Sequence, residues 1–319
     1  PPWMIELPLR ISYNRYMDQI CSEHLENHTN KTYQERMNQA ASSKFGAIEK
    51  HLGENVKLLD FGSGFSPEFI KQVTQTGTHY VAYDVSQIVQ SQLQENNIDF
   101  ITKEQLENIE DEFDIIYMSS VFHELMSYLS RPERTKTFAM LDRALKPDGT
   151  IIIRDWGPGE TSSLVTSIEV ASEDVNDEVY TWIEALVKNS VISMPTIVCD
   201  DNDNPIVPYI YKANNQTIYE IMFHAVWGLD SLERESKESY VIVDNLIHKW
   251  ICAPHGYKIT QSRNEFDETY LPHLQKYFKI DSIPWPTKVI YELKKDCNNT
   301  PANFIAQLPQ WITTISTTN

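Results

Sequence analysis

The fold of this chain is decided by the stretch Lys57-Leu58-Leu59-Asp60-Phe61-Gly62-Ser63-Gly64-Phe65-Ser66-Pro67. Its apolar start predicts a short buried strand of the kind found in parallel sheets. Gly62 and Gly64 then allow a sharp turn and a close approach of the backbone to a ligand. Ser66 is a favourable N-cap residue and Pro67 suits the first helical position, so a helix is predicted to begin here. The turn therefore aims free N–H groups and a helix N-terminus at a bound molecule.

Two common nucleotide-binding patterns do not fit this stretch. The dinucleotide fingerprint requires a third glycine at the position where this chain has Pro67. The phosphate-binding loop of nucleoside triphosphatases requires Gly-Lys-Ser/Thr, which does not follow the turn. What remains is a hydrophobic residue, Asp, a second hydrophobic residue and Gly-x-Gly. This pattern resembles motif I of the class I S-adenosylmethionine (SAM) methyltransferases.

A second acidic residue supports the resemblance. Residues 79–84 read as a strand that ends in Asp84, 24 residues after Asp60. This is close to the spacing at which an acid meets a ribose in nucleotide-binding folds, and one carboxylate can accept from both hydroxyls. Further segments follow in the order of the family: 98–101 as strand three, 113–120 resembling motif IV, and 145–153 resembling the motif V turn and strand. Together these segments span residues 45–156, roughly a third of the chain.

The resemblance implies an α/β fold with a Rossmann-like, seven-stranded, mostly parallel sheet and helices on both faces. It also implies a mostly helical insertion between strands five and six, and SAM as the cofactor. Ligands of such sheets sit outside the carboxyl ends of the strands. The residues expected to bind the cofactor are Asp60, Gly62, Ser63, Gly64, Asp84, Val85 and Ser119.

The chain is expected to divide into five segments. They are an N-terminal helical segment (1–50), a SAM-binding core (51–159), a helical insertion that covers the acceptor (160–255), the last two strands of the core (256–296) and a C-terminal tail (297–319). The insertion is predicted because about a hundred residues stand where the family usually has one helix. Three helical stripes mark it, and they begin at Val179, Ile218 and Val241.

Composition restricts the partners of the protein. The 45 acidic and 27 basic residues give a formal net charge of −18, which repels phosphate backbones unless basic residues cluster locally. The four cysteines form no CxxC pair, so we expect neither a metal site nor a disulfide framework. The sequence has no run of 18 apolar residues and no signal peptide, so a cytoplasmic protein without a membrane segment is expected. The oligomeric state stays open.

Three residues near the ends of strands four and five are candidates for catalysis. His123 and Glu124 follow strand four, and a histidine is suited to take a proton near neutral pH. Asp155 follows strand five and could orient the acceptor, orient His123 or serve as a base. Alternatively, His123 packs against the following helix, and Asp155 pairs with Arg154 or with a loop N–H. Methyl transfer from a sulfonium mainly requires positioning and exclusion of water, and only sometimes a base.

Several functions are compatible with this sequence. The favoured one is a methyltransferase that acts on a small molecule or a protein. An RNA (cap or tRNA) methyltransferase is an alternative, because five basic residues lie in one segment: Arg131, Arg134, Lys136, Arg143 and Lys146. A non-catalytic partner subunit is a further alternative, although it would be expected to lose the cofactor motifs. No Asn-Pro-Pro-Tyr/Phe and no Pro-Cys follows strand four, which disfavours two routes of nucleobase methylation.

Overall fold

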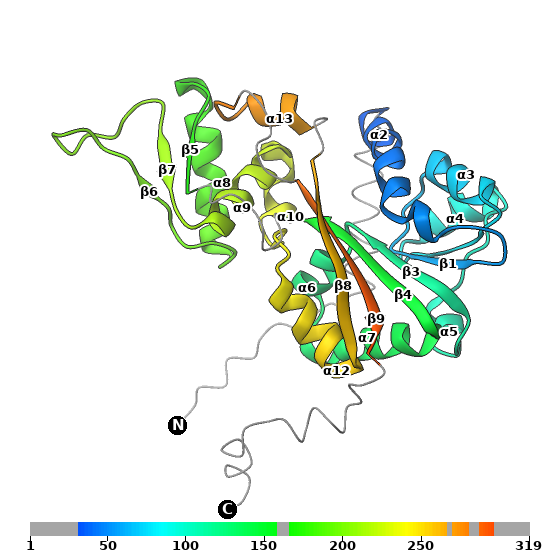
Figure 1. Ribbon diagram of the computed structural model, residues 1–319. Helices are drawn as coiled ribbons and strands as arrows, with labels where there is room; N and C mark the ends of the chain where they lie inside the picture. Colours follow the sequence, from blue (N-terminus) through cyan, green and yellow to red (C-terminus); the bar gives the residue numbers. More distant parts are fainter. Residues whose placement is uncertain (1–30, 158–165, 267–269, 281–286, 297–319) are drawn as a thin grey trace, which may run out of the picture.

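The computed structural model describes residues 31–157, 166–266, 270–280 and 287–296 (Figure 1). Of the predicted N-terminal helical segment, the described part holds helix α2 (Lys31–Ile48) and the short helix η1 (Glu49–His51). Residues 1–30 of that segment and the predicted tail at 297–319 lie outside the described residues.

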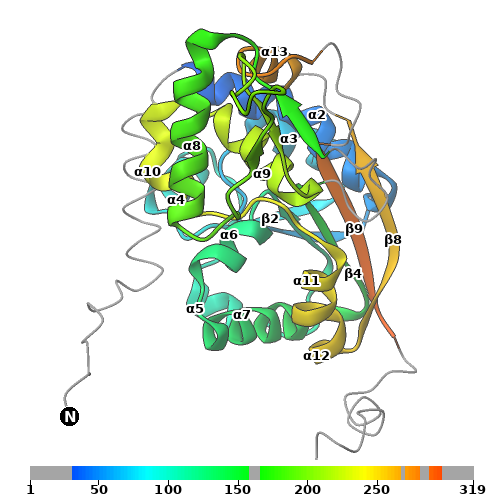
Figure 2. The same ribbon diagram turned by 90° about the vertical axis from the view of Figure 1, so that its left-hand side faces the viewer.

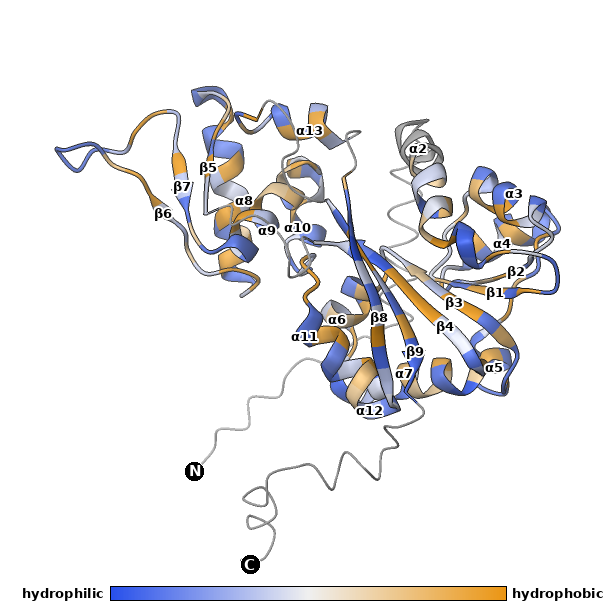
Figure 3. Ribbon diagram, in the orientation of Figure 1, coloured by the Kyte–Doolittle hydropathy of each residue, from blue (hydrophilic) through white to orange (hydrophobic). Residues whose placement is uncertain are grey.

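A central sheet of six strands has the order β2-β1-β3-β4-β9-β8. The first four strands pair in parallel, β9 runs antiparallel to β4, and β8 runs antiparallel to β9. The strands are β1 (Lys57–Phe61), β2 (His79–Tyr83), β3 (Phe113–Ser119), β4 (Leu145–Trp156), β8 (Tyr257–Glu265) and β9 (Lys288–Lys295). Figure 3 shows apolar residues along the central strands β3 and β4, as expected for strands that are buried on both faces.

Helices cover both faces of the sheet, as predicted. Leu58 packs with α2, α3 (Pro67–Gln75) and α4 (Gln87–Glu95), whereas Leu59 packs on the opposite face. That face is covered by α5 (Lys103–Leu106), α6 (Phe122–Tyr128), α7 (Arg131–Ala144), α11 (Asp244–Ile247), the π-helix η4 (His248–Cys252) and α12 (Ala253–His255). Successive strand residues point to opposite faces, so one apolar run supplies two cores.

The sheet differs from the prediction in its number of strands, because the expected third strand at 98–101 is not formed. Phe100 makes only an isolated parallel bridge to Ala82. Asn97 precedes the segment with a left-handed backbone (φ 54°), and Thr102 follows it as the N-cap of α5 with a complete capping box. The turn on one side and the helix start on the other leave too few extended residues for a ladder.

The segment between β4 and β8 is only partly as predicted. Its main helices are α8 (Asn176–Lys188) and α9 (Asn215–Ala225), which bury the predicted stripes. It also contains a three-stranded antiparallel sheet that we did not expect, of order β5-β7-β6. The remaining elements are β5 (Ser167–Glu169), η2 (Glu173–Val175), β6 (Thr196–Ile197), β7 (Ile210–Lys212), η3 (Leu229–Ser231) and α10 (Leu232–Glu235). Strands of two or three residues are too short to show a period in the sequence.

This segment packs as a cover on the carboxyl end of β4. Trp156, the last residue of β4, contacts the rings of Phe223, Tyr240 and Tyr270. Figures 1 and 2 show α8, α9 and α10 grouped at that end of the sheet, together with α13 (Leu271–Gln275). The predicted third stripe is divided: Val241 precedes α11 and packs with the cover, whereas Leu246 of α11 and Trp250 of η4 pack on the sheet itself. None of the helices in the described part of the chain combines the length and the apolar composition that a membrane crossing needs.

Candidate functional site

The turn after β1 is locked onto the end of β2. Gly62 and Gly64 have left-handed backbones, with φ of 73° and 56°. The amides of Gly62 and Ser63 donate to the Tyr83 carbonyl at 2.8 and 3.1 Å, and the Gly64 amide donates to Asp84 Oδ2 at 2.8 Å. This turn of residues 62–64, the cradle, is therefore held in shape by its own hydrogen bonds.

Gly62 is required for packing as well as for backbone conformation. A Cβ atom added here would lie 2.6 Å from Val121 Cγ2, a distance that real Cβ atoms essentially never show. Val121 follows β3, so the turn after β1 packs directly against the end of β3. The sequence predicted a close approach to a ligand, but the contact that excludes a side chain at Gly62 is with Val121.

Asp84 lies at the mouth of this cradle. Its Oδ1 accepts from the Ser86 amide at 2.9 Å, while its Oδ2 holds Gly64. Burial raises the pKa of Asp84, and the backbone hydrogen bonds oppose that effect. Each carboxylate oxygen can accept more than one hydrogen bond, so the half-buried side chain can still accept from a ligand. Val85, next to it, is half-buried and packs against the apolar cluster that contains Leu59.

Asp60, at the end of β1, interacts with residues of β2 and α2. Its carboxylate is buried, accepts a hydrogen bond from Tyr80 at 2.8 Å and feels the charge of Lys44 in α2. Burial raises the pKa of Asp60 to about 6 and lowers the pKa of Lys44 to about 8. The side chain therefore helps to hold α2 against the sheet, beneath the cradle.

Two buried hydroxyls near the cradle have no hydrogen-bond partner among the residues that the structure describes. Ser66 occupies the N-cap position of α3 as predicted, but its side chain makes no capping bond. Ser119 Oγ, at the end of β3, is likewise buried and unpaired. Ser63 Oγ, in contrast, donates to the Gly64 carbonyl at 2.9 Å. Buried polar atoms are normally paired, so these two mark places where a polar ligand such as SAM fits.

His123 and Asp155 meet at the carboxyl ends of β3 and β4. Nδ1 of His123 lies 2.8 Å from Asp155 Oδ1, and the His123 amide donates to Oδ2 at 3.0 Å. Asp155 is fully buried and also accepts from the Trp156 amide. Arg154, which the sequence offered as the alternative partner of Asp155, instead pairs with Glu265 of β8.

A residue that the sequence did not identify faces the other side of the same ring. Glu238, from the cover, places Oε2 3.5 Å from His123 Nε2, and its Oε1 accepts from the Tyr128 hydroxyl. Burial would lower the pKa of His123, but Asp155 and Glu238 together raise it well above its ordinary value. Since both ring nitrogens face carboxylates, the imidazole is held as a cation.

Glu124, the third candidate for catalysis, follows His123 in α6. It is half-buried at the start of α6, and burial, followed by repulsion from Glu238, raises its pKa to about 8. At neutral pH this carboxyl group therefore carries its proton. Asp84 and Asp155 contribute to the same repulsion.

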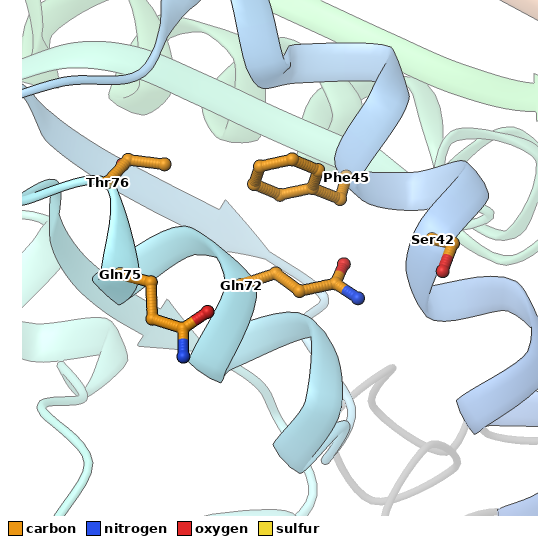
Figure 4. Close-up of a pocket in the computed structure, with 5 residues that line it drawn as sticks. All are labelled: Ser42, Phe45, Gln72, Gln75 and Thr76. Atoms are coloured by element: carbon orange, nitrogen blue, oxygen red, sulfur yellow. The ribbon is translucent and has the colours of Figure 1, made fainter.

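The pocket shown in Figure 4 is remote from these groups. Ser42 and Phe45 of α2 and Gln72, Gln75 and Thr76 of α3 line it. These α3 residues lie at the carboxyl-terminal end of the helix, next to Thr78 at the amino end of β2. Within the described ranges, no group of three or more His, Cys, Asp or Glu side chains could hold a metal ion.

Comparison with known proteins agrees with this geometry. A family described as "Methyltransferase domain" matches residues 32–192. The fold is similar to a SAM-dependent methyltransferase from Mesorhizobium loti, with a TM-score of 0.46 and 14% identity over 81% of this chain and 100% of that one. It is also similar to the Burkholderia thailandensis 1,6-didemethyltoxoflavin-N1-methyltransferase, with a TM-score of 0.47 and 11% identity over 92% and 94%. No curated protein matches the chain.

The matched region covers slightly more than half of the chain and contains the turn after β1, Asp84, His123 and Asp155. It also contains the four parallel strands of the sheet. The chain thus belongs to the methyltransferase-domain family and is a SAM-dependent methyltransferase of class I.

Proposed function

We propose that this methyltransferase acts on a small-molecule acceptor, bound between the carboxyl ends of β3 and β4 and the cover. The observation that carries the proposal is the His123–Asp155 pair. Glu238 of the cover faces the other ring nitrogen of His123. His123, Trp156 and Glu238 are each at most 6% exposed, so these side chains are shielded from solvent. An enclosed site of aromatic and a few charged groups is typical of small-ligand recognition.

The cofactor is proposed to lie over the turn at 62–64. Asp84 would accept from the ribose hydroxyls, and Ser119 and Ser66 would supply the hydroxyls that have no partner in the protein. SAM supplies the methyl group as a sulfonium, and the transfer is an in-line displacement. The protein's share of the work is to align donor and acceptor and to exclude water.

We propose the division of the chain into the five predicted segments. Within the predicted insertion, residues 166–241 form the acceptor cover. The aromatic contacts of Trp156 fix this cover on the sheet, and residues 270–280 pack in the same apolar cluster. Trp156 and Tyr240 stack with ring centroids 5.6 Å apart, which supplies a flat apolar wall at the end of β4.

The basic segment that suggested RNA is engaged within the protein. Lys136 pairs with Glu107, and Lys146 pairs with Asp114 at the start of β3, both at 2.8 Å. Arg134 and Arg143 donate to backbone carbonyls. Lys146 therefore lies at the amino ends of the strands, opposite to the site. In addition, the net charge of −18 repels a phosphate backbone.

Replacing Asp84 with alanine is expected to weaken the binding of S-adenosylhomocysteine roughly 5- to 150-fold. This corresponds to the loss of about 1–3 kcal/mol from a charged hydrogen bond. Isothermal titration calorimetry measures the change. Asp99→Ala is the matched control, because the Asp99 side chain is 71% exposed beside the same edge strand. Equal affinities for the two variants would remove Asp84 from the cofactor site.

The acceptor class is tested by methyl transfer from tritiated SAM to a panel of small amines, phenols and thiols. Total tRNA and a denatured protein mixture complete the panel, and the Asp84→Ala protein serves as the blank. Transfer confined to small molecules supports the proposal. Transfer only to tRNA or to protein, or no binding of SAM at all, would refute it.

His123 is expected to be doubly protonated at about pH 7.5, because carboxylates face both ring nitrogens. We assign the ring a positioning role, since an imidazolium has no lone pair with which to take a proton. Nitrogen-15 NMR of histidine-labelled protein measures this state, and the His123→Ala variant identifies the signals. The exposed His79 ring is the internal control. A neutral His123 ring would instead restore the hypothesis of a histidine base.

A further inference from the structure

A buried lysine lies at the same edge of the sheet and has no place in the mechanism described so far. Lys288 is the first residue of β9, pairs with Trp156 in the ladder and is 2% exposed. Its Nζ lies 2.8 Å from Ser120 Oγ and 3.5 Å from the centre of the Trp156 ring. The side chain thus crosses the end of β4 to reach the residue that follows β3.

The surroundings of Lys288 satisfy an ammonium ion only in part, through the Trp156 ring beneath Nζ. Such an ion has three N–H donors, yet within the described ranges its only hydrogen bond is to Ser120 and it has no ion pair. The neighbouring charged groups are Arg154 and Asp155 of β4, Glu265 of β8 and Lys44 of α2. Asp155 is engaged by His123, and Glu265 is engaged by Arg154. Burial, together with the charge of Arg154, lowers the pKa of Lys288 well below its ordinary value.

Ser120 has an unusual backbone for its position. It joins β3 to α6 with a φ of 58°, in the left-handed region that side chains other than Gly, Asn and Asp rarely adopt. Its amide donates to the Arg154 carbonyl at 2.7 Å, which holds the strained residue in place. Backbone strain of this kind concentrates at functional sites. Here it places a half-buried hydroxyl against Lys288, three residues before His123 in the chain.

We propose that Lys288 receives, through Ser120, the proton that the acceptor loses on methylation. This inference rests on the proposed function. The acceptor atom attacks the methyl carbon of the sulfonium, and the carbon–sulfur bond breaks with its electron pair going to sulfur. The proton of the acceptor passes to Ser120 Oγ, while the hydroxyl proton of Ser120 passes to Lys288 Nζ. The products are the methylated acceptor, S-adenosylhomocysteine and a lysine ammonium that later releases its proton to solvent.

The proposal also narrows the class of acceptor. A base is useful only if the reacting atom carries a proton that must leave, as in a hydroxyl group or a primary or secondary amine. Thioethers and tertiary amines need no base, and we expect them to be poor substrates. In the acceptor panel, each hydroxyl or secondary amine is therefore paired with its thioether or tertiary amine counterpart.

The protonation state of Lys288 is measured without any acceptor, by NMR of protein labelled at the lysine ε-carbon. The Lys288→Met variant identifies the signal, and Lys288→Arg serves if the methionine protein does not fold. We expect the Lys288 signal to have a midpoint well below the ordinary value of 10.5. A Lys288 signal that stays that of an ammonium up to about pH 9 overturns the proposal.

Turnover rates of variants distinguish a catalytic base at Lys288 from a structural cation. Lys288→Met and Lys288→Arg are both expected to lower the rate roughly 10²–10⁴-fold, with unchanged affinity for SAM. Arginine keeps a cation over Trp156 but cannot accept a proton, so a near-normal rate for Lys288→Arg overturns the proposal. Ser120→Gly removes the hydroxyl without backbone strain and should also be slow, while Lys279→Met should be normal. A protein that binds no SAM refutes the proposed function instead, and the NMR titration still reports on the lysine.

Discussion

Replacing Asp155 with alanine is expected to lower the free energy of unfolding by about 3–5 kcal/mol, the usual effect of removing one partner of a buried charged pair. Asp155 is fully buried and accepts hydrogen bonds from the ring and amide of His123 and from the Trp156 amide. Without it, the imidazolium keeps only Glu238 as a partner. Urea unfolding, monitored by tryptophan fluorescence, measures the change.

The matched control is Asp148→Ala, which removes an exposed carboxylate from the same strand. This control should change stability by less than about 0.5 kcal/mol. Similar losses for both variants would contradict the role of the buried pair. The activity of Asp155→Ala should also be lost, because the orientation of the His123 ring depends on this carboxylate.

The pair also predicts how the difference between wild type and Asp155→Ala depends on pH. Burial by itself would raise the pKa of Asp155, but the charge and hydrogen bonds of His123 lower it below 3.8. Its stabilisation is therefore present above 3.8 and is lost as the pH falls through the folded-state value. The raised pKa of His123 gives a contribution that is complete below 6.5 and is lost as the pH rises through its folded-state value. The difference in stability between wild type and Asp155→Ala should therefore be largest between pH 3.8 and pH 6.5.

Replacing Gly62 with valine is expected to abolish cofactor binding and to destabilise the protein by about 2–5 kcal/mol. Overpacking against Val121 contributes about 1–3 kcal/mol, and the left-handed backbone contributes about 1–2 kcal/mol for a residue with a Cβ atom. The turn can relieve both only by moving away from β3, which would pull Gly64 from Asp84. Thermal unfolding and calorimetry with S-adenosylhomocysteine measure the two effects.

A double-mutant cycle separates the steric part from the backbone part. Val121→Ala makes room for a Cβ atom at position 62, so Gly62→Ala should be less harmful in that background. Gly53→Ala is the control, because a Cβ atom there would meet nothing within 4 Å and its backbone is not left-handed. If Val121→Ala rescues nothing, the contact with Val121 is not what excludes side chains at Gly62.

The parts of the site that could be predicted from the sequence are local. The strand, the glycine turn and the helix start occupy one continuous stretch, and Asp84 follows at the end of the next strand. His123 and Asp155 could be selected because each stands near the carboxyl end of a central strand, and parallel strands end at one edge. Their meeting at 2.8 Å then depends on the direct pairing of β3 with β4.

Other expectations failed because short segments carry little pattern. Residues 98–101 are apolar enough for a strand, but the turn at Asn97 and the helix cap at Thr102 leave only one bridge to Ala82. The sheet of β5, β6 and β7 was missed for a related reason, since its strands are two or three residues long. Asp60 shows a different limit, because the motif marks the residue without showing that its side chain points towards α2.

The sequence by itself determined the class of fold, the position of the cofactor turn and the enzyme family, since these depend on neighbouring residues and on the order of the strands. Only the tertiary structure decided which charged groups meet. Lys288 reaches Ser120 across 168 residues of chain, and Glu238 reaches His123 from the cover. Neither contact has a local signal, because it depends on the register of β9 against β4 and on how the cover packs on Trp156. Burial then sets the charge of each group, and burial is a property of the folded chain alone.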